Sequence, residues 1–243
     1  MTLSPSSPHQ EGSHFYPHVS VDCVILGYDG EALKVLLSRR SDENPQAGLR
    51  TLKLPGRLLY TNEDIDEAAS DIITQLTGSD RHYIHQFKAF GSPHRTSNPR
   101  DVLWLENAVK LKIGRLVTIG YMTLIRINER NNRRFAGLEV EWHRVDELPE
   151  LAFDHNHIIS EALMEMERIS TMRPQLIFEM LPPKFTALQL RRLHEQILGK
   201  SLDVRNFHKQ VMTRSYIIPL DEYEVGVAHR AARYYKFQVS KKK

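Results

Sequence analysis

Five carboxylates lie close together between positions 63 and 71 of a chain of 243 residues. They are Glu63, Asp64, Asp66, Glu67 and Asp71. In a helix, Asp64, Glu67 and Asp71 would share one face, because their spacing is i, i+3 and i+7. Magnesium prefers several such oxygens, and a bound metal can neutralise phosphates and activate water. The segment is therefore a candidate for metal-assisted hydrolysis of a diphosphate linkage. The alternative is that these side chains solvate a helix and complement its dipole.

A loop and a helix must position these carboxylates. Gly56 is expected to close a turn after an extended stretch, and Thr61 or Asn62 to cap a helix that runs to about Leu76. Gly78 is the expected C-terminal stop. Apolar residues recur at helical spacing in this segment, so we expect one side of the helix to be buried. They are Ile65, Ala68, Ala69, Ile72, Ile73 and Leu76.

Strand-like segments surround this helix from about residue 19 to 145, because residues there alternate or run apolar over lengths typical of strands. A second helix is expected after Asp154 as its N-cap. Its buried face would carry Ile158, Ala162, Met166 and Ile169. We therefore predict an α+β domain over residues 17–170, a linker over 171–183 and a C-terminal domain over 184–240.

The composition favours a cytoplasmic globular protein. Hydrophobic residues make up 41% of the chain and charged residues 26%, which is ordinary for a soluble domain. The single cysteine, Cys23, is expected in the core of a strand, which excludes disulfides and favours a reducing compartment. Residues 1–16 are predicted to be a disordered tail and not a signal peptide. No apolar run approaches the length of a membrane span.

The charge is unevenly distributed along the chain. Residues 184–243 hold 13 Lys and Arg against 5 Asp and Glu, a net charge of +8, although the whole chain carries +3. Residues 1–183 therefore carry −5. A basic module on an acidic body is expected where that module meets a polyanion. A solvated basic tail accounts only for the final three lysines.

Two short helices open the C-terminal part. Thr186 and Gln189 form a T-x-x-Q capping box, and Gly199 is expected to end the first helix. Its buried stripe would be Leu190, Leu193 and Ile197. Asp203 is expected to cap a second helix over residues 204–214. The inner face of that helix is predicted to carry Val204, Phe207 and Val211.

The outer face of the second helix is polar and basic, and a hairpin around Gly226 follows it. Helix, turn, helix and basic hairpin make the pattern of a winged helix-turn-helix, whose second helix can enter a major groove. Arg205 could bond guanine and Asn206 adenine, while other basic groups contact phosphates. The predicted DNA-binding residues are Lys184, Arg205, Asn206, Lys209, Thr213, Arg214, His229, Arg230 and Arg233. For each one taken singly, the solubility of an exposed surface is the competing explanation.

From about residue 19 to 147 the chain resembles a Nudix domain, whose box motif holds a metal through glutamates. Aligned on Gly78, the chain keeps the first glutamate of the box as Glu63 and has Arg57 in place of the box glycine. At the later glutamates it has Ile72, Gln75 and Leu76. Isoleucine and leucine bind no metal, so the resemblance implies a scaffold without catalytic residues, metal or cofactor.

Residues 151–170, 178–212 and 230–237 resemble the linker helix, winged helix and wing of Nudix-related transcriptional regulators. That family includes NrtR-type repressors of NAD metabolism and arabinose regulators. The resemblance implies a Nudix-like mixed sheet and helix sandwich followed by a winged helix-turn-helix domain. It also implies a homodimer, a palindromic operator in double-stranded DNA, and a small effector such as a pentose or ADP-ribose.

Effector-binding side chains are expected near the cleft of the Nudix-like domain, where they could meet a phosphate or a sugar hydroxyl. The candidates are Arg39, Arg40, Arg57, Glu63 and Arg95, although each arginine is also plausible as a surface residue. Residues 96–113 form an apparent insertion relative to the family. They could cover the effector pocket, reach a partner subunit or form a surface excursion without a role. Leu103, Trp104 and Leu105 favour packing. His155 and His157 diverge on a helix, so local capping is expected and not a metal pair.

Three functions remain open. The leading hypothesis is an effector-responsive repressor of pentose or NAD-related genes. The alternative is an active Nudix hydrolase of ADP-ribose or a sugar nucleotide, with a metal site altered to use the carboxylates of residues 63–71. A sugar- or nucleotide-binding module that acts through protein partners is the third hypothesis, and it leaves the basic C-terminal part without a role.

Overall fold

The computed structural model describes residues 14–40, 51–135, 137–228 and 230–238. The chain divides into two compact units. In the described part of the chain, the first unit contains residues 14–26, 34–40, 51–123 and 128–162, and the second contains the rest. Among the described residues, no helix is both long and apolar enough to cross a membrane.

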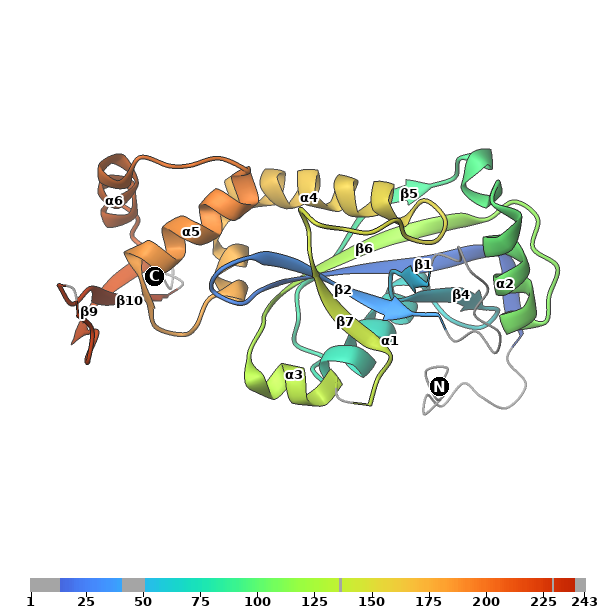
Figure 1. Cartoon of the computed structure of the whole chain (residues 1–243), viewed down its shortest axis with the longest axis horizontal. Coiled ribbons are helices and arrows are strands. Elements are labelled where there is room, and N and C mark those ends of the chain that lie inside the picture. The colour runs from blue at the N-terminus through green and yellow to red at the C-terminus, as the bar shows by residue number, and fades with distance from the viewer. Residues whose placement is uncertain (1–13, 41–50, 136, 229, 239–243) are drawn as a thin grey trace. The chain divides into compact units, whose positions relative to one another are not determined.

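Most of a seven-stranded sheet lies in the first unit (Figure 1). The strands run in the order β3-β2-β1-β6-β5, with β4 also paired to β1 and β7 to β2. Their bounds are β1 Phe15–Tyr28, β2 Leu33–Arg39, β3 Leu52–Lys53, β4 Gly56–Tyr60, β5 Ile84–Phe90, β6 Val117–Arg126 and β7 Val140–Arg144. The pairs β1–β4, β2–β3, β2–β7 and β5–β6 are antiparallel.

Strand β1 supplies the centre of the core. Residues 20–28 are all buried, and Cys23 is fully enclosed as expected. The predicted tail ends too late, because β1 already begins at Phe15, whose ring stacks on that of Tyr60 at 4.8 Å. Residues 1–13 of that tail lie outside the described residues.

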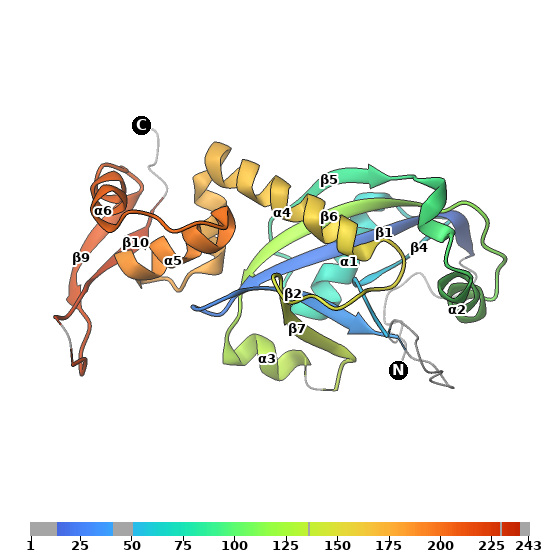
Figure 2. The same ribbon diagram turned by 45° about the horizontal axis from the view of Figure 1, so that its top comes forward.

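Helix α1 (Ile65–Thr77) carries the predicted buried stripe and stops at Gly78, which is left-handed at φ 68°. The predicted N-cap is wrong. Asp64 caps the helix through the Asp66 N–H, and Glu67 reaches back to the Asp64 N–H. This reciprocal box satisfies two orphan backbone donors, which neither Thr61 nor Asn62 could do in that register. Helix α1 and the first turns of α4 (His155–Met172) lie on opposite faces of the sheet (Figure 2).

Among the strands and α-helices of the first unit, three were not expected from the sequence. They are β4, helix α2 (Pro99–Val109) and helix α3 (Glu129–Phe135). The predicted turn at Gly56 is instead the first residue of β4. Helix α2 begins with Asn98, whose side chain accepts from the Arg100 N–H, and with Pro99 in its first turn. A short 3-10 helix, η1 (Pro93–Thr96), precedes α2.

The second unit contains η2 (Pro174–Met180), β8 (Phe185–Thr186), α5 (Ala187–Leu198), α6 (Val204–Met212), β9 (Ile217–Tyr223) and β10 (Arg233–Phe237). The strands form a sheet in the order β8-β10-β9. Part of the predicted linker is packed into this unit, because Phe178 stacks on Phe237 at 4.6 Å between ring centroids. The predicted capping box of Thr186 and Gln189 is present, and Gly199 ends α5 at φ 60°.

Candidate nucleic-acid interface and ligand pocket

Helix α6 is held by two apolar side chains and capped as predicted. The Asp203 carboxylate accepts from the Asn206 N–H at 2.8 Å, and Phe207 and Val211 are 8% and 4% exposed. The assignment of Val204 to the inner face is wrong, since it is 60% exposed. Val204 is the first residue of the helix, so only the later turns bury their apolar face.

The opposite face of α6 is exposed and polar. It presents Arg205, Asn206, Lys209 and, just beyond the helix, Thr213 and Arg214. Thr213 is the C-cap, and its hydroxyl donates to the Gln210 carbonyl at 2.8 Å. His208, which was not among the predicted DNA-binding residues, is also exposed on this helix. Its position three residues after Arg205 on the same helix was the available signal.

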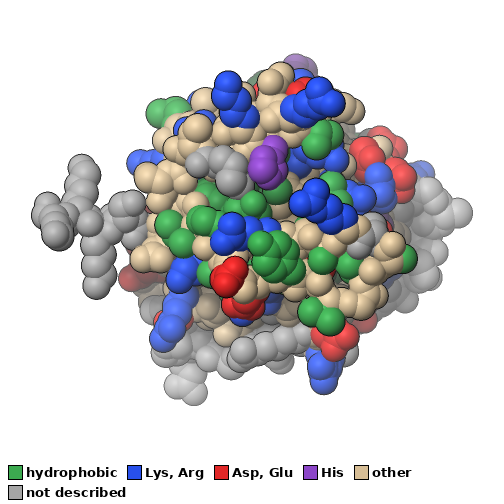
Figure 3. All heavy atoms as spheres, turned by 90° about the vertical axis from the view of Figure 1, so that its left-hand side faces the viewer, with side chains coloured by type: hydrophobic (Ala, Val, Ile, Leu, Met, Phe, Trp, Pro, Cys, Tyr) green, Lys and Arg blue, Asp and Glu red, His purple; other side chains and the backbone are tan. Residues whose placement is uncertain are grey.

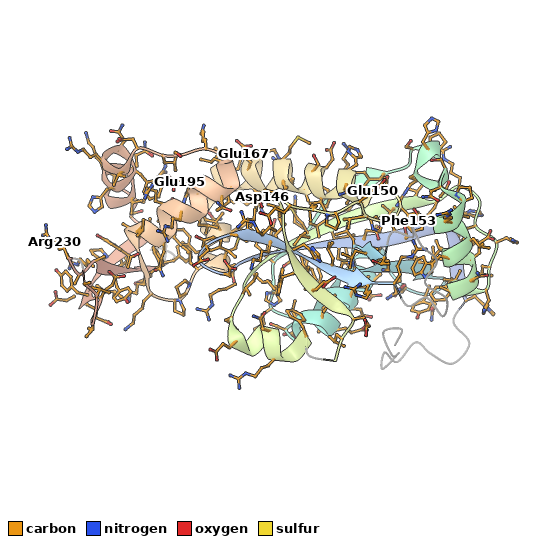
Figure 4. The ribbon with its side chains drawn as sticks, in the orientation of Figure 1. Asp146, Glu150, Phe153, Glu167, Glu195 and Arg230 are labelled. Carbon is orange, nitrogen blue, oxygen red and sulfur yellow. The ribbon has the colours of Figure 1, made fainter. Side chains whose placement is uncertain are left out.

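The wing is the hairpin of β9 and β10. The DNA-binding residues predicted in and beside it differ in the contacts that they make within the protein. Lys184 is exposed but pairs with Glu222, and Arg233 is half-buried, with its Nε donating to the Leu220 carbonyl at 2.6 Å. Both therefore also stabilise the wing. Arg230 is exposed and extends from the outer end of the hairpin (Figure 4). His229 lies outside the described residues.

Lys and Arg side chains are spread over the face of the second unit that Figure 3 presents, with apolar side chains and smaller groups of acidic ones between them. The same unit contains a cavity of about 390 Å³ beside α6. Its charged lining residues, Asp203 and Arg214, are both exposed. The cavity therefore lacks the buried charged groups that distinguish the pocket of the first unit.

The carboxylates of residues 63–71 are largely engaged by the protein. Both Glu63 oxygens bond Arg57, the second at 2.7 Å from Nη2, and one also accepts from the Tyr60 N–H. Asp64 and Glu67 form the cap of α1, and Asp66 accepts from the Tyr121 hydroxyl. Among the described residues, no group of three or more His, Cys, Asp or Glu is placed to hold a metal. Ile72 and Leu76 are 2% and 1% exposed, in the apolar stripe of α1.

A small pocket of about 50 Å³ lies in the first unit. Of the predicted effector residues, Arg57 and Arg95 line it, whereas Arg39, Arg40 and Glu63 do not. Arg39 is at the surface and pairs with Glu141 at 2.7 Å. The other lining residues are Ser20, Asp22, Lys53, Gly56, Leu58, Trp104, Leu105, Leu116, Phe153 and His155.

Buried charges converge on Asp22 in this pocket. Arg95 Nη2 lies 3.6 Å from Asp22 Oδ2 and 3.3 Å from Asp154 Oδ1, and its side chain is 1% exposed. The Thr118 hydroxyl donates to Asp22 at 2.7 Å. Among the described residues, Arg95 Nε and the Ser20 hydroxyl have no hydrogen-bond partner. Buried donors without a partner are costly, so this pocket favours a polar guest or water.

His155 belongs to this cluster, and its assignment to local capping is wrong. Its Nδ1 accepts from the Leu54 N–H at 2.9 Å, and its Nε2 lies 3.7 Å from Asp22 Oδ1. Burial lowers the pKa of His155 to about 4, with Asp22 opposing that shift. His157 points elsewhere, with 59% of its side chain exposed, so the predicted divergence of the two histidines is confirmed.

The apparent insertion provides one wall of the pocket through Trp104 and Leu105. Leu105 also packs on the cluster of Leu58, Ile113 and Leu116. Packing was expected for Leu103 as well, but that residue is 56% exposed on the other side of α2. Asp22 could have been noticed in the sequence as the only charge in an apolar strand, whereas nothing local marked Lys53 or Phe153.

A Nudix-like unit followed by a winged helix unit is the arrangement for which the motifs resembled Nudix-related transcriptional regulators. The family model described as the NrtR DNA-binding winged helix domain matches residues 177–237. The ADPR responsive transcriptional repressor NtrR of Acinetobacter baylyi is 25% identical over 233 residues, which cover 94% of this chain and 85% of that protein.

Solved structures agree in fold over both units. NrtR of Shewanella oneidensis complexed with a 27mer DNA has a TM-score of 0.68 and 24% identity, covering 90% of this chain and 93% of that chain. A second structure of NrtR from the same organism has a TM-score of 0.67 and 25% identity, covering 90% of this chain and 94% of that chain.

Proposed function

We propose that this protein is an effector-responsive transcriptional repressor, in which the winged helix unit binds operator DNA and the Nudix-like unit senses a small molecule. The observation that carries the proposal is helix α6. It is anchored by Phe207 and Val211, presents Arg205, Asn206 and Lys209 to solvent, and lies within the residues matched by the winged helix family model.

The proposed effector is ADP-ribose or a closely related sugar phosphate. Two features support this choice: the A. baylyi relative is named as ADPR responsive, and the pocket holds buried cationic groups suited to phosphate oxygens. A pentose is the competing effector. The operator is proposed to be a palindrome bound by a homodimer, because a symmetric protein matches two half-sites. NAD-related genes are the proposed targets.

The hydrolase alternative has less support. Glu63 is bonded by Arg57 and Tyr60, and Ile72 and Leu76 offer no oxygen to a metal. The proposal therefore includes that the Nudix-like unit binds its ligand without cleaving it. Incubation of the protein with ADP-ribose and Mg²⁺ or Mn²⁺ tests this point, and release of AMP would contradict it.

Fluorescence anisotropy on DNA from upstream of the gene and its neighbours tests the DNA-binding function. The measurement is made at two salt concentrations, with and without ADP-ribose, arabinose and ribose 5-phosphate. We expect one fragment to bind preferentially, more weakly at high salt, and to be released by ADP-ribose. Equal weak binding of all fragments would reject α6 as a recognition helix.

A further inference from the structure

Helix α2 is fixed to the pocket through one buried carboxylate. Asp101 Oδ1 lies 2.6 Å from Arg40 Nη1, and the two side chains are 2% and 0% exposed. Asp101 Oδ2 accepts from the Phe153 N–H at 2.9 Å. Phe153 lies beside α2 (Figure 4) and has a positive φ of 54°, a strained conformation for a residue with a side chain.

A guanidinium group and a backbone N–H that converge on two oxygens form an anion site. Arginine forks bind carboxylate and phosphate oxygens in the same manner. Here the anion is supplied by the chain itself, from a helix that the family resemblance does not account for. Trp104 completes the cover, because the Arg40 guanidinium lies 4.2 Å from the centre of its ring.

The pocket next to this cover is too small for a nucleotide. Its volume of about 50 Å³ has room for one or two waters, at roughly 30 Å³ each, whereas drug-sized ligands occupy roughly 300–1,000 Å³. Trp104 and Leu105 of α2 form one wall of this space. A sugar nucleotide can therefore enter only if a wall of the pocket moves, and α2 supplies one of these walls.

We propose that α2 is a displaceable lid, and that its Asp101 carboxylate occupies the site of a ligand phosphate beside Arg40 and the Phe153 N–H. This inference rests on the proposed ligand-sensing function of the Nudix-like unit. An anionic ligand competes with Asp101 for Arg40, so binding displaces α2 and uncovers Trp104. A neutral pentose has no group that replaces the carboxylate, and it leaves the lid closed.

Tryptophan fluorescence tests the lid without altering it. The chain has two tryptophans, so the Trp142→Phe variant leaves Trp104 as the reporter. We expect ADP-ribose to shift Trp104 emission to longer wavelengths and to accelerate hydrogen exchange of the amides in residues 102–109. Arabinose should do neither. If calorimetry shows that ADP-ribose binds while emission and exchange stay unchanged, the lid is wrong and the sensing function stands.

Variants of the lid give a second test. Trp104→Ala should bind ADP-ribose at least about fivefold more tightly, because loss of the ring contact with Arg40 weakens the closed state that competes with the ligand. Leu103→Ala, on the exposed side of the same helix, is the control and should bind as the wild type does. Equal affinities of all three proteins would overturn the lid, and absence of ADP-ribose binding in all three would overturn both the lid and the proposed effector.

Inorganic phosphate probes the anion site directly. Asp101→Asn leaves the buried Arg40 without its carboxylate partner, which destabilises the fold. Added phosphate should therefore raise the melting temperature of this variant more than that of the wild type. Asp146→Asn removes an exposed carboxylate that pairs with Arg144 at 2.7 Å, and serves as the charge-matched control. Equal phosphate effects on all three proteins would contradict the shared site.

Discussion

Glu63 and Arg57 lie where the box of a Nudix domain would have a glutamate and a glycine, and together they form an ion pair. The Glu63 side chain is 1% exposed, and the Arg57 guanidinium also lies 4.5 Å from the ring centre of Tyr60. A buried carboxylate already held by three donors has little capacity left for a metal. At the residue scale, Arg57 gives Glu63 a structural partner within the protein.

Gly56 leaves no space for a side chain. A Cβ at this position would meet Asp22 Oδ1, and would lie 2.5 Å from the Val21 carbonyl oxygen. We expect Gly56→Ala to lower the free energy of unfolding by at least about 2 kcal/mol, because strand β4 must move away from β1. Denaturant titration measures the effect. Gly114→Ala is the control, since a Cβ there would meet only His18 among the described residues, at 3.9 Å. An equal loss of stability in both variants would contradict a steric effect at Gly56.

His155 makes the stability depend on pH in the acidic range. Its pKa is lowered to about 4 in the folded protein from about 6.5 when unfolded, so the unfolded state takes up the proton first. The stabilisation is complete above pH 6.5 and falls as the pH falls towards 4, by up to roughly 3 kcal/mol.

The variant His155→Asn should flatten this dependence, because its amide oxygen can still accept from the Leu54 N–H but does not titrate. Denaturant unfolding at intervals between pH 4 and 7 measures the slope. His157→Asn removes an exposed imidazole from the same helix and should keep the wild-type slope. Parallel curves for all three proteins would exclude His155 as the source.

At the element scale, helices whose ends are marked by capping residues or a glycine stop were predictable. The capping residues Thr186, Gln189 and Asp203, together with the stop at Gly199, fixed α5 and α6 from neighbouring residues alone. Helix α2 has comparable local signals in Asn98 and Pro99, but residues 96–113 were treated as an apparent insertion and no helix was predicted there.

The pocket was only partly predictable, because its partners are distant in sequence. Arg95, predicted from the motif that ends there, lines the pocket, whereas Arg40, also predicted for the cleft, does not line it and pairs with Asp101. Those two residues are 61 positions apart, and no spacing rule links a strand end to the first turn of an unforeseen helix. The position of Phe153 beside α2 depends on the same tertiary contact, since its N–H donates to Asp101.

The exposed face of α6 leads to a prediction that separates contacts with bases from contacts with phosphates. Arg205→Ala should lose about 1–3 kcal/mol on the operator but little on unrelated DNA, because a base contact is lost. Lys209→Ala should weaken binding to the operator and to unrelated DNA alike, and should reduce the number of ions released on binding by about one. Anisotropy titrations at several salt concentrations measure both effects. Arg81→Ala removes an exposed charge from the first unit, and a similar loss there would attribute the effects to net charge.

At the scale of the whole molecule, the acidic and basic parts of the chain imply two linked equilibria. The 13 basic against 5 acidic side chains of residues 184–243 favour DNA, while the pocket lies in the other unit. If ligand and operator bind to different states, their effects must be reciprocal.

We therefore expect the factor by which saturating ADP-ribose weakens operator binding to equal the factor by which operator DNA weakens ADP-ribose binding. Anisotropy gives the first factor and calorimetry on the preformed complex gives the second. An unrelated DNA of equal length is the control for charge alone. Unequal factors would show that the ligand changes the assembly state as well as the affinity.

The enclosed thiol of Cys23 can report when the sheet around it opens. The chain has a single cysteine, it lies in the middle of β1 with no exposed surface, and burial raises its pKa. A thiol reagent added to the native protein can therefore react only in molecules whose sheet has separated. The labelling rate then measures how often the sheet opens. A ligand that stabilises the Nudix-like unit would slow the labelling, and no engineered label is needed.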